Sequence, residues 1–145
     1  MADTKNVAKH LNNLIQLDYD AIAAYDAAIE RLENPDFETK LREFRDDHLA
    51  HVEKLGELVQ AQGSEPASSS DMKKVLTKGQ VVMGGLVGDG AILEAMKLNE
   101  DQTNSMYEAE TAEDMPPEVH QALERGLADE RRHRAWIQKT LAEIA

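Results

Sequence analysis

The sequence predicts an all-α protein, a four-helix bundle made of two helical hairpins. Three observations lead to this fold class. Apolar residues recur at spacings of three and four in four long segments, as on one face of a helix. Only 4% of the 145 residues are aromatic, whereas Ala, Leu, Glu, Lys and Gln are abundant, which favours helix over strand. A long segment between the second and third helices can carry the chain from one hairpin to the other.

The first hairpin covers the first two apolar stripes. Its helices are expected to meet at Asn34-Pro35, because proline cannot continue a helix but suits the first turn of the next one, with Asn34 as N-cap. The second helix should end near Gln62-Gly63. The first stripe contains Val7, Leu11, Leu14, Ala21, Tyr25, Ile29 and Leu32, with position 18 in its gap. The second contains Phe37, Leu41, Phe44, Leu55 and Leu58, with His48 and His51 in its gap.

A crossover over about residues 64–90 is expected to join the hairpins. It begins with the low-complexity stretch SEPASSS, in which Ser70 or the following Asp71 can cap a short helix over 72–87. Gly88-Asp89-Gly90 should break the chain before a third helix over about 91–112. The fourth helix is expected over about 117–144, with Glu130 and His133 in the gap of its stripe. All of this fits one domain over residues 1–145.

Composition excludes several classes of function. With no cysteine, the chain has neither disulfides nor thiolate metal sites. A net charge of −12 disfavours binding to nucleic acid or to an anionic membrane surface. No apolar run approaches the ~20 residues that span a bilayer, and the first residues, MADTKNVAKH, do not form a secretory signal. We therefore expect a soluble, cytoplasmic protein.

A repeat relates the two hairpins. Shifting the sequence by 82 residues superposes the segment from Leu11 to Val59 on that from Leu93 to Leu141 without a gap. The matched pairs include Tyr25 with Tyr107, Pro35 with Pro117, Leu41 with Leu123, Asp47 with Asp129, and His51 with His133, and Asp18 falls on Glu100. In both hairpins the histidine follows the acid by 33 residues, which places the two side chains at one level of the bundle.

The repeat predicts a ring of six ionisable side chains in the core. His48 and Glu130 join it, because each lies three residues before a matched histidine and shares its helix face. The ring is Asp18, His48, His51, Glu100, Glu130 and His133. Burying these groups without compensation would cost many kcal/mol, and a metal ion removes that penalty. Carboxylate oxygens with imidazole nitrogens suit iron or manganese, with zinc also possible.

A metal-free polar core is the alternative interpretation, in which the same groups form buried salt bridges and hydrogen bonds. Tyr25 and Tyr107 are expected to donate hydrogen bonds to the ligands. Asp47 and Asp129 lie about 100° around the helix from their neighbouring candidate ligands, and so are expected outside the ring.

These residues resemble the ferritin-like di-iron carboxylate superfamily, in which two helices each supply a Glu and the other two each supply a Glu-x-x-His. Glu100 and Glu130-Arg-Arg-His133 match that pattern, Asp18 stands where the family has Glu, and His48 replaces the bridging Glu. The resemblance implies two iron ions held by the ring. Because a His cannot bridge through two oxygens, a dinuclear site with weakened bridging, a mononuclear site and a site lost on one side all stay open. The stretch GDGAILEAMKLNEDQ is also similar to small bacterial ferritin-like proteins of the stress-associated kind, for which no activity is implied.

Three functions therefore follow as expectations. The first is a small oxidoreductase with oxidase-, peroxidase- or ferroxidase-like chemistry, in which the metals react with O₂ or peroxide. The second is a non-catalytic metal-binding protein with the same ligands. The third is a metal-free structural or stress-response bundle. A homodimer is expected, because helix surfaces of such bundles often pair.

Overall fold

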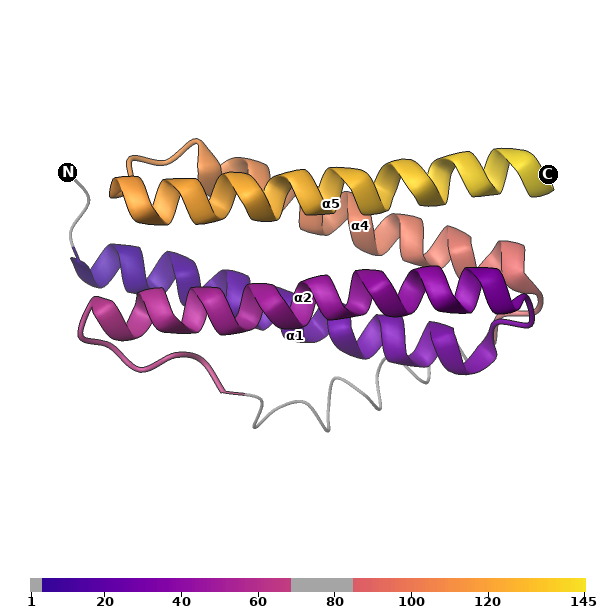
Figure 1. Cartoon of the computed structure of the whole chain (residues 1–145), viewed down its shortest axis with the longest axis horizontal. Coiled ribbons are helices and arrows are strands. Elements are labelled where there is room, and N and C mark those ends of the chain that lie inside the picture. Colours follow the sequence, from indigo (N-terminus) through magenta and orange to yellow (C-terminus); the bar gives the residue numbers. More distant parts are fainter. Residues whose placement is uncertain (1–3, 69–84) are drawn as a thin grey trace.

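A computed structural model describes residues 4–68 and 85–145 of the chain. They form four long helices, α1 (Thr4–Arg31), α2 (Pro35–Ala61), α4 (Asp89–Thr111) and α5 (Pro117–Ile144) (Figure 1). The predicted all-α class and the pairing into two hairpins are confirmed.

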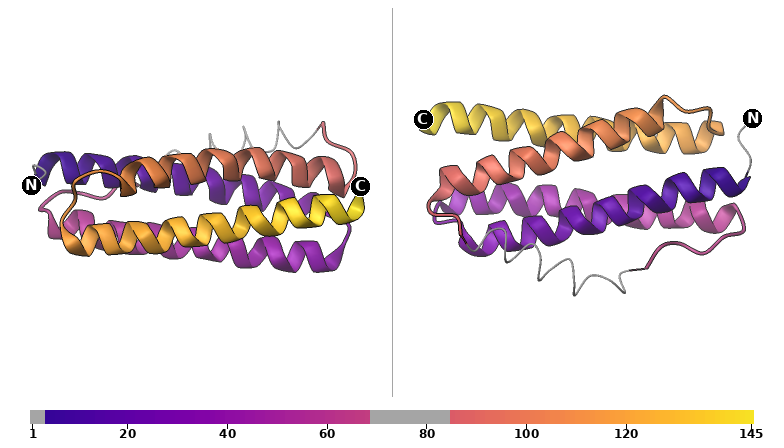
Figure 2. Two further views of the ribbon diagram at one scale, coloured as in Figure 1. Left: turned by 90° about the horizontal axis from the view of Figure 1, so that it is seen from above. Right: turned by 180° about the vertical axis from the view of Figure 1, so that it is seen from behind.

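The two hairpins pack side by side. α1 packs on α2 and α4 on α5, and α1 also lies against α4 (Figure 2). α2 runs beside α5 with opposite chain direction, and of the four packed pairs these two helices touch each other least. The α2–α5 seam is therefore the most open line along the bundle.

Local chemistry sets the helix ends. The Asn34 side chain accepts a hydrogen bond from the backbone N–H of Asp36 at 2.9 Å, which confirms it as the N-cap of α2. After α2, Gly63 takes a positive φ of 79°, and the N–H groups of Gly63 and Ser64 donate back to Gln60 and Val59, as in a Schellman motif. Glycine is favoured there because a side chain is strained in that backbone region.

α4 begins two residues earlier than the sequence predicted. Asp89 and Gly90, expected in the break, belong to the helix, and Gly88 alone marks the turn with a φ of 89°. The carboxylate of Asp89 accepts hydrogen bonds from the backbone N–H groups of Glu33 at 2.8 Å and Asn34 at 3.0 Å. These contacts fix the start of α4 to the α1–α2 turn, which explains the earlier start.

The crossover is described only at its two ends. The expected cap at Ser70 or Asp71, and the expected short helix over 72–87 up to residue 84, lie outside the described residues. Residues 85–88 are not helical. At the other end, the Asn12 side chain on α1 donates to the carbonyl of Glu65 at 3.1 Å and accepts from the N–H of Ala67 at 2.7 Å.

The core consists of two apolar clusters, one toward each end of the bundle. One contains Leu11, Leu14, Leu55 and Leu123, and the other contains Ile29, Phe44, Leu93 and Ile137. Fully buried ionisable side chains lie between these clusters. No helix among the described residues is long and apolar enough to cross a bilayer.

Replacing Asp89 by alanine is expected to lower the free energy of unfolding by about 1 to 2 kcal/mol, because two charge-assisted hydrogen bonds between the hairpins are lost. Urea denaturation of both proteins measures the difference. Asp89→Asn, which keeps one acceptor oxygen, should lose less. Glu118→Ala is the control. It removes an acid from the first turn of α5, where the carboxylate stabilises the helix only through its interaction with the helix dipole. Equal losses in Asp89→Ala and Glu118→Ala would contradict the assigned role.

Candidate metal centre

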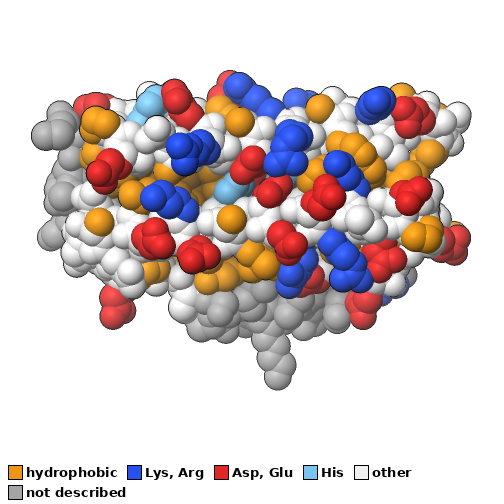
Figure 3. Space-filling model, viewed as in Figure 1, with side chains coloured by type: hydrophobic (Ala, Val, Ile, Leu, Met, Phe, Trp, Pro, Cys, Tyr) orange, Lys and Arg blue, Asp and Glu red, His pale blue; other side chains and the backbone are white. Residues whose placement is uncertain are grey.

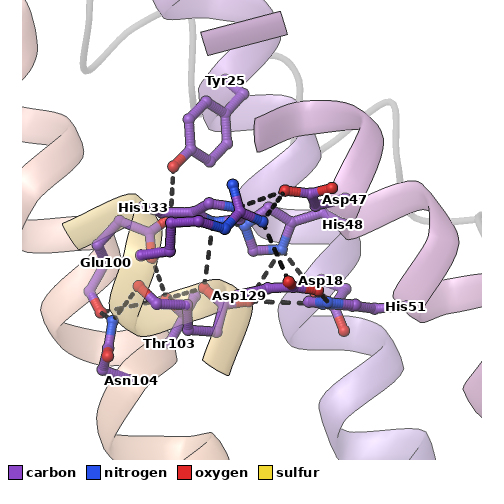
Figure 4. Close-up of polar contacts among 12 residues, drawn as sticks. Asp18, Tyr25, Asp47, His48, His51, Glu100, Thr103, Asn104, Asp129 and His133 are labelled. Carbon is purple, nitrogen blue, oxygen red and sulfur yellow. Dashed lines mark hydrogen bonds and ion pairs between the residues drawn. The ribbon is translucent and has the colours of Figure 1, made fainter. Parts of the chain in front are cut away.

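The six side chains of the predicted ring meet in one layer midway along the bundle. His51 is 8% exposed and the other five are 0% exposed. Each of the four helices contributes: Asp18 from α1, His48 and His51 from α2, Glu100 from α4, and Glu130 and His133 from α5 (Figure 4). The repeat had placed all of them at this level.

These side chains form two overlapping groups of four. One is Asp18, His48, His51 and Glu130, and the other is His48, Glu100, Glu130 and His133. Within each group one ligand atom from every residue lies within 4.8 Å of all the others. His48 and Glu130 belong to both groups, so the two groups are adjacent and share these two side chains.

In the first group the carboxylate of Asp18 lies between two imidazoles. Its Oδ1 is 2.7 Å from Nδ1 of His48 and 3.3 Å from Nδ1 of His51. Oε1 of Glu130 faces the same nitrogens, at 3.4 Å from His48 and 3.6 Å from His51. Three of the four helices thus place donors around one small volume.

In the second group, Glu100 takes the place that Asp18 has in the first. Its Oε1 lies 3.3 Å from Nδ1 of His133 and 3.5 Å from Nε2 of His48. Oε2 of Glu130 is 3.8 Å from Nδ1 of His133. His48 therefore turns Nδ1 toward one group and Nε2 toward the other.

Two aspartates hold the outer nitrogens of His51 and His133. Nε2 of His51 is 2.9 Å from Asp129, and Nε2 of His133 is 2.8 Å from Asp47. Arg132 donates to both aspartates, at 2.8 Å to Asp47 and 3.0 Å to Asp129. Because Nε2 of each histidine is directed to its aspartate, Nδ1 is the nitrogen left to face the centre. Asp47 and Asp129 therefore lie outside the ring, as the sequence predicted, but contact it directly.

Both repeat tyrosines donate their hydroxyl groups into the centre. Tyr25 donates to Oε1 of Glu100, and Tyr107 donates to Oδ2 of Asp18 at 2.5 Å. Both rings are buried. Burial, followed by the charge of the facing carboxylate, raises the pKa of each tyrosine well above 10, so both stay protonated donors.

Two further polar residues at the centre were not predicted. Thr103 donates to Oε2 of Glu130 at 2.8 Å, and its hydroxyl also lies 3.1 Å from Oε2 of Glu100. Asn104 donates to the backbone carbonyls of Glu100 and Glu130 at 2.7 and 3.0 Å. Thr103 lies on the inner stripe of its helix, but nothing in that pattern distinguishes a polar role from packing. Its repeat partner is Ala21, so the repeat gave no signal either.

Comparison with known proteins places the chain in a family. The family described as "Domain of unknown function (DUF2383)" matches residues 6–113, which contain α2, α4 and nearly all of α1. The chain belongs to this family. The match includes the ring residues of the first three helices and ends before Glu130 and His133. Among curated proteins, no sequence matches.

Among solved structures, the chain is similar to Dps from Thermosynechococcus elongatus. The TM-score is 0.74 at 16% sequence identity, over 97% of this chain and 95% of that chain. At this identity the similarity concerns the fold alone, and it confirms the ferritin-like four-helix bundle that the sequence predicted. The DUF2383 match and this similarity together cover both hairpins.

The ionisable side chains of the centre balance one another's charges. Burial alone would lower the pKa of His51 and His133, but the facing carboxylates outweigh it and raise both to about 9. Burial alone would raise the pKa of Asp18, yet hydrogen bonds from His48 and His51 lower it. Burial raises the pKa of Glu130, which has another carboxylate, Glu100, beside it.

The arrangement leaves buried atoms that protein groups do not satisfy. Nε2 of His48, Nδ1 of His133 and Oε1 of Glu130 have no hydrogen-bond partner. Their nearest opposite charges lie at 3.3 to 3.5 Å, beyond good hydrogen-bond length. With metal–ligand bonds of about 2.1 Å, two ligand atoms on one ion lie about 3 to 4.2 Å apart. The spacing of these residues could therefore accommodate a metal ion.

The free energy of unfolding of chelator-treated protein is expected to fall as pH rises from 6.5 to 9. His51 and His133 hold their protons up to about pH 9 in the folded state but only to about 6.5 unfolded, so their stabilisation is complete below 6.5 and is lost above it. The pKa of Glu130, raised from 4.5 to about 7, acts in the same direction, but its effect ends near pH 7 and contributes only to the start of this interval. Urea denaturation at stepped pH measures this slope.

Metal-loaded protein is the control for that measurement. Metal binding requires deprotonated ligands, so loading should remove or reverse the fall over the same interval. Constant stability of the metal-free protein from pH 6.5 to 9 would contradict the charge balance described above.

Proposed function

We propose that this protein binds transition-metal ions at the two overlapping groups, with iron as the resident metal and two ions per chain. The observation that supports the proposal is the set of unpartnered nitrogen and oxygen atoms on His48, Glu130 and His133, which lie inside a layer of fully buried side chains. Asp18 and His51 would complete the first group, and Glu100 and His133 the second.

The donor chemistry favours iron or manganese over other metals. Each group offers two carboxylates and two imidazoles, and no thiolate is available to select Cu(I) or a cluster. Asp47 and Asp129 support the ligands, since a carboxylate on the outer nitrogen orients an imidazole and raises its basicity. His48 presents one nitrogen to each group. As a neutral imidazole it would be a ligand in one group at a time, and it would bind in both only as an imidazolate; it cannot bridge through oxygens as a glutamate does.

We further propose that the centre serves a redox reaction with O₂ or peroxide. Bound iron would supply the electrons for that reaction. The chain contributes hydrogen-bond donors at the carboxylates, because the hydroxyls of Tyr25 and Tyr107 are directed at Glu100 and Asp18. Thr103 gives Glu130 a further hydrogen bond, which holds one of its oxygens while the other stays free.

Non-catalytic metal binding is the second candidate function, and the position of His48 favours it. His48 stands where a bridging carboxylate would couple two ions, and an imidazole would couple them less. With weaker coupling between the ions, the protein would retain metal while turning over slowly.

Metal content of the variants tests the assignment. After anaerobic Fe(II) loading and gel filtration, the wild-type chain should retain about two irons by plasma mass spectrometry. His51→Ala removes a ligand of the first group only, and His133→Ala of the second only, so each should retain about one. Glu130→Gln removes a shared ligand and should weaken binding at both.

Glu124→Gln is the matched control, because this exposed glutamate on α5 pairs with His120 at the surface. It should bind as the wild type does. Circular dichroism verifies that each variant remains helical. No bound metal in a folded wild-type chain after loading with Fe(II), Mn(II) or Zn(II) would overturn metal binding itself.

Oxygen consumption separates the two candidate functions. On exposure to air, the Fe(II)-loaded wild type should consume O₂ and gain near-ultraviolet absorbance within minutes, and His48→Glu, which restores a bridging carboxylate, should do so faster. Retention of two Fe(II) ions without O₂ consumption would support the non-catalytic function. Glu124→Gln again serves as the control.

A further inference from the structure

A groove along the α2–α5 seam leads from the surface to one end of the centre. Its volume is about 460 Å³, within the range of small-molecule sites. Figure 3 shows hydrophobic surface along this seam, with Lys and Arg side chains beside it. His51, Asp129 and Tyr107 are among its lining residues, so the groove reaches the side chains of the centre.

The 82-residue repeat relates the lining of this groove to the packing at the other end of the seam. At the other end, four side chains cover the centre: Lys40, Phe44, Arg132 and Trp136. Their repeat counterparts are Ala122, Gly126, Ala50 and Lys54, and all four line the groove. Alanine thus stands opposite each of the two long cations, glycine opposite the phenylalanine, and a flexible lysine opposite the tryptophan.

The covered end is closed by aromatic packing. The ring of Phe44 stacks on His133 with centroids 4.3 Å apart, and Trp136 meets Phe44 edge-on at 5.7 Å. Lys40 and Arg132 lie over the same Phe44 ring at 5.8 and 6.0 Å. His133 is accordingly 0% exposed.

The open end depends on Gly126. A Cβ atom there would lie 2.5 Å from Cε1 of Tyr107, so only glycine lets the tyrosine ring lie against α5. Tyr107 forms part of the groove lining and donates to Asp18. His51, the counterpart of His133, keeps 8% of its surface exposed.

The lining has the character of a site for an amphipathic anion. Leu55, Leu58 and Ala122 supply apolar surface. Lys54 and Arg125 are exposed on the same groove, and neither forms an ion pair with another described side chain. Two acids also line the groove. Asp129 is paired with His51 and accepts a hydrogen bond from Arg132, and Glu118 lies in the first turn of α5.

We propose that this groove binds a carboxylate with a short unbranched apolar chain, its head group at Lys54 and Arg125, one helical turn from His51 and Asp129, and its chain along Leu55, Leu58 and Ala122. The chain would cover the apolar lining, and the two cations would pair with the head group. The proposal deepens the proposed function by naming the class of molecule that binds beside the centre, and its relevance to metal chemistry rests on that proposed function. Binding itself is measurable without metal.

Calorimetric titration of the chelator-treated, full-length protein with hexanoate and octanoate tests this. Saturable binding of one carboxylate per chain is expected, at least tenfold tighter than binding of 1-hexanol or 1-octanol. The double substitution Lys54→Ala and Arg125→Ala should raise the Kd at least tenfold. Ala50→Trp, at an exposed lining position, should raise it similarly by filling the groove.

The controls change the same residue types off the groove. Arg131→Ala and Ala128→Trp are exposed positions on α5 outside the lining and should leave the Kd within twofold. In histidine ring NMR spectra, octanoate should shift the signals of His51 and not those of His133.

Three results would overturn the proposal: no saturable binding, equal affinity for the alcohol and the carboxylate, or equal effects of groove and control variants. Metal content is determined on the same preparations. Normal iron loading without carboxylate binding would refute the groove assignment alone, whereas carboxylate binding without iron loading would refute the metal centre alone.

Discussion

The cost of burying charge is the constraint on which this structure depends. Six ionisable side chains lie in a layer between two apolar clusters, and five of them are fully shielded from water. A single unpaired carboxylate in such surroundings costs several kcal/mol. The surrounding residues reduce that cost by directed hydrogen bonds: two tyrosines, a threonine and two aspartates each satisfy a member of the layer. The atoms that remain unsatisfied are the ones suited to a cation.

Arg132 illustrates how far this compensation extends. It lies outside the layer, yet it pairs with both aspartates that hold the histidines and also covers Phe44. One exposed side chain thus joins α2 to α5 across the seam where these helices touch least. The apolar clusters hold the hairpins together, and the polar contacts set which atoms face inward.

Much of this could be predicted from the sequence. Helical periodicity and Asn34-Pro35 predicted the first hairpin, because both are local signals. The repeat predicted the polar layer, because in each hairpin the acid and the histidine lie at nearly equal distances from the turn and so at one level. The start of α4 was wrong by two residues, since the contacts of Asp89 with the α1–α2 turn are tertiary. Thr103 and Asn104 were missed because their partners in the repeat are apolar.

The groove was missed for another reason: it results from side chains that are absent. Gly126 gave no signal alone, and only its equivalence to Phe44 shows what is missing. This difference has an evolutionary consequence. In a symmetric dimer of identical hairpins every substitution occurs twice, so a phenylalanine that closed one end would close both. Because both hairpins belong to one chain, selection can keep one entrance and seal the other.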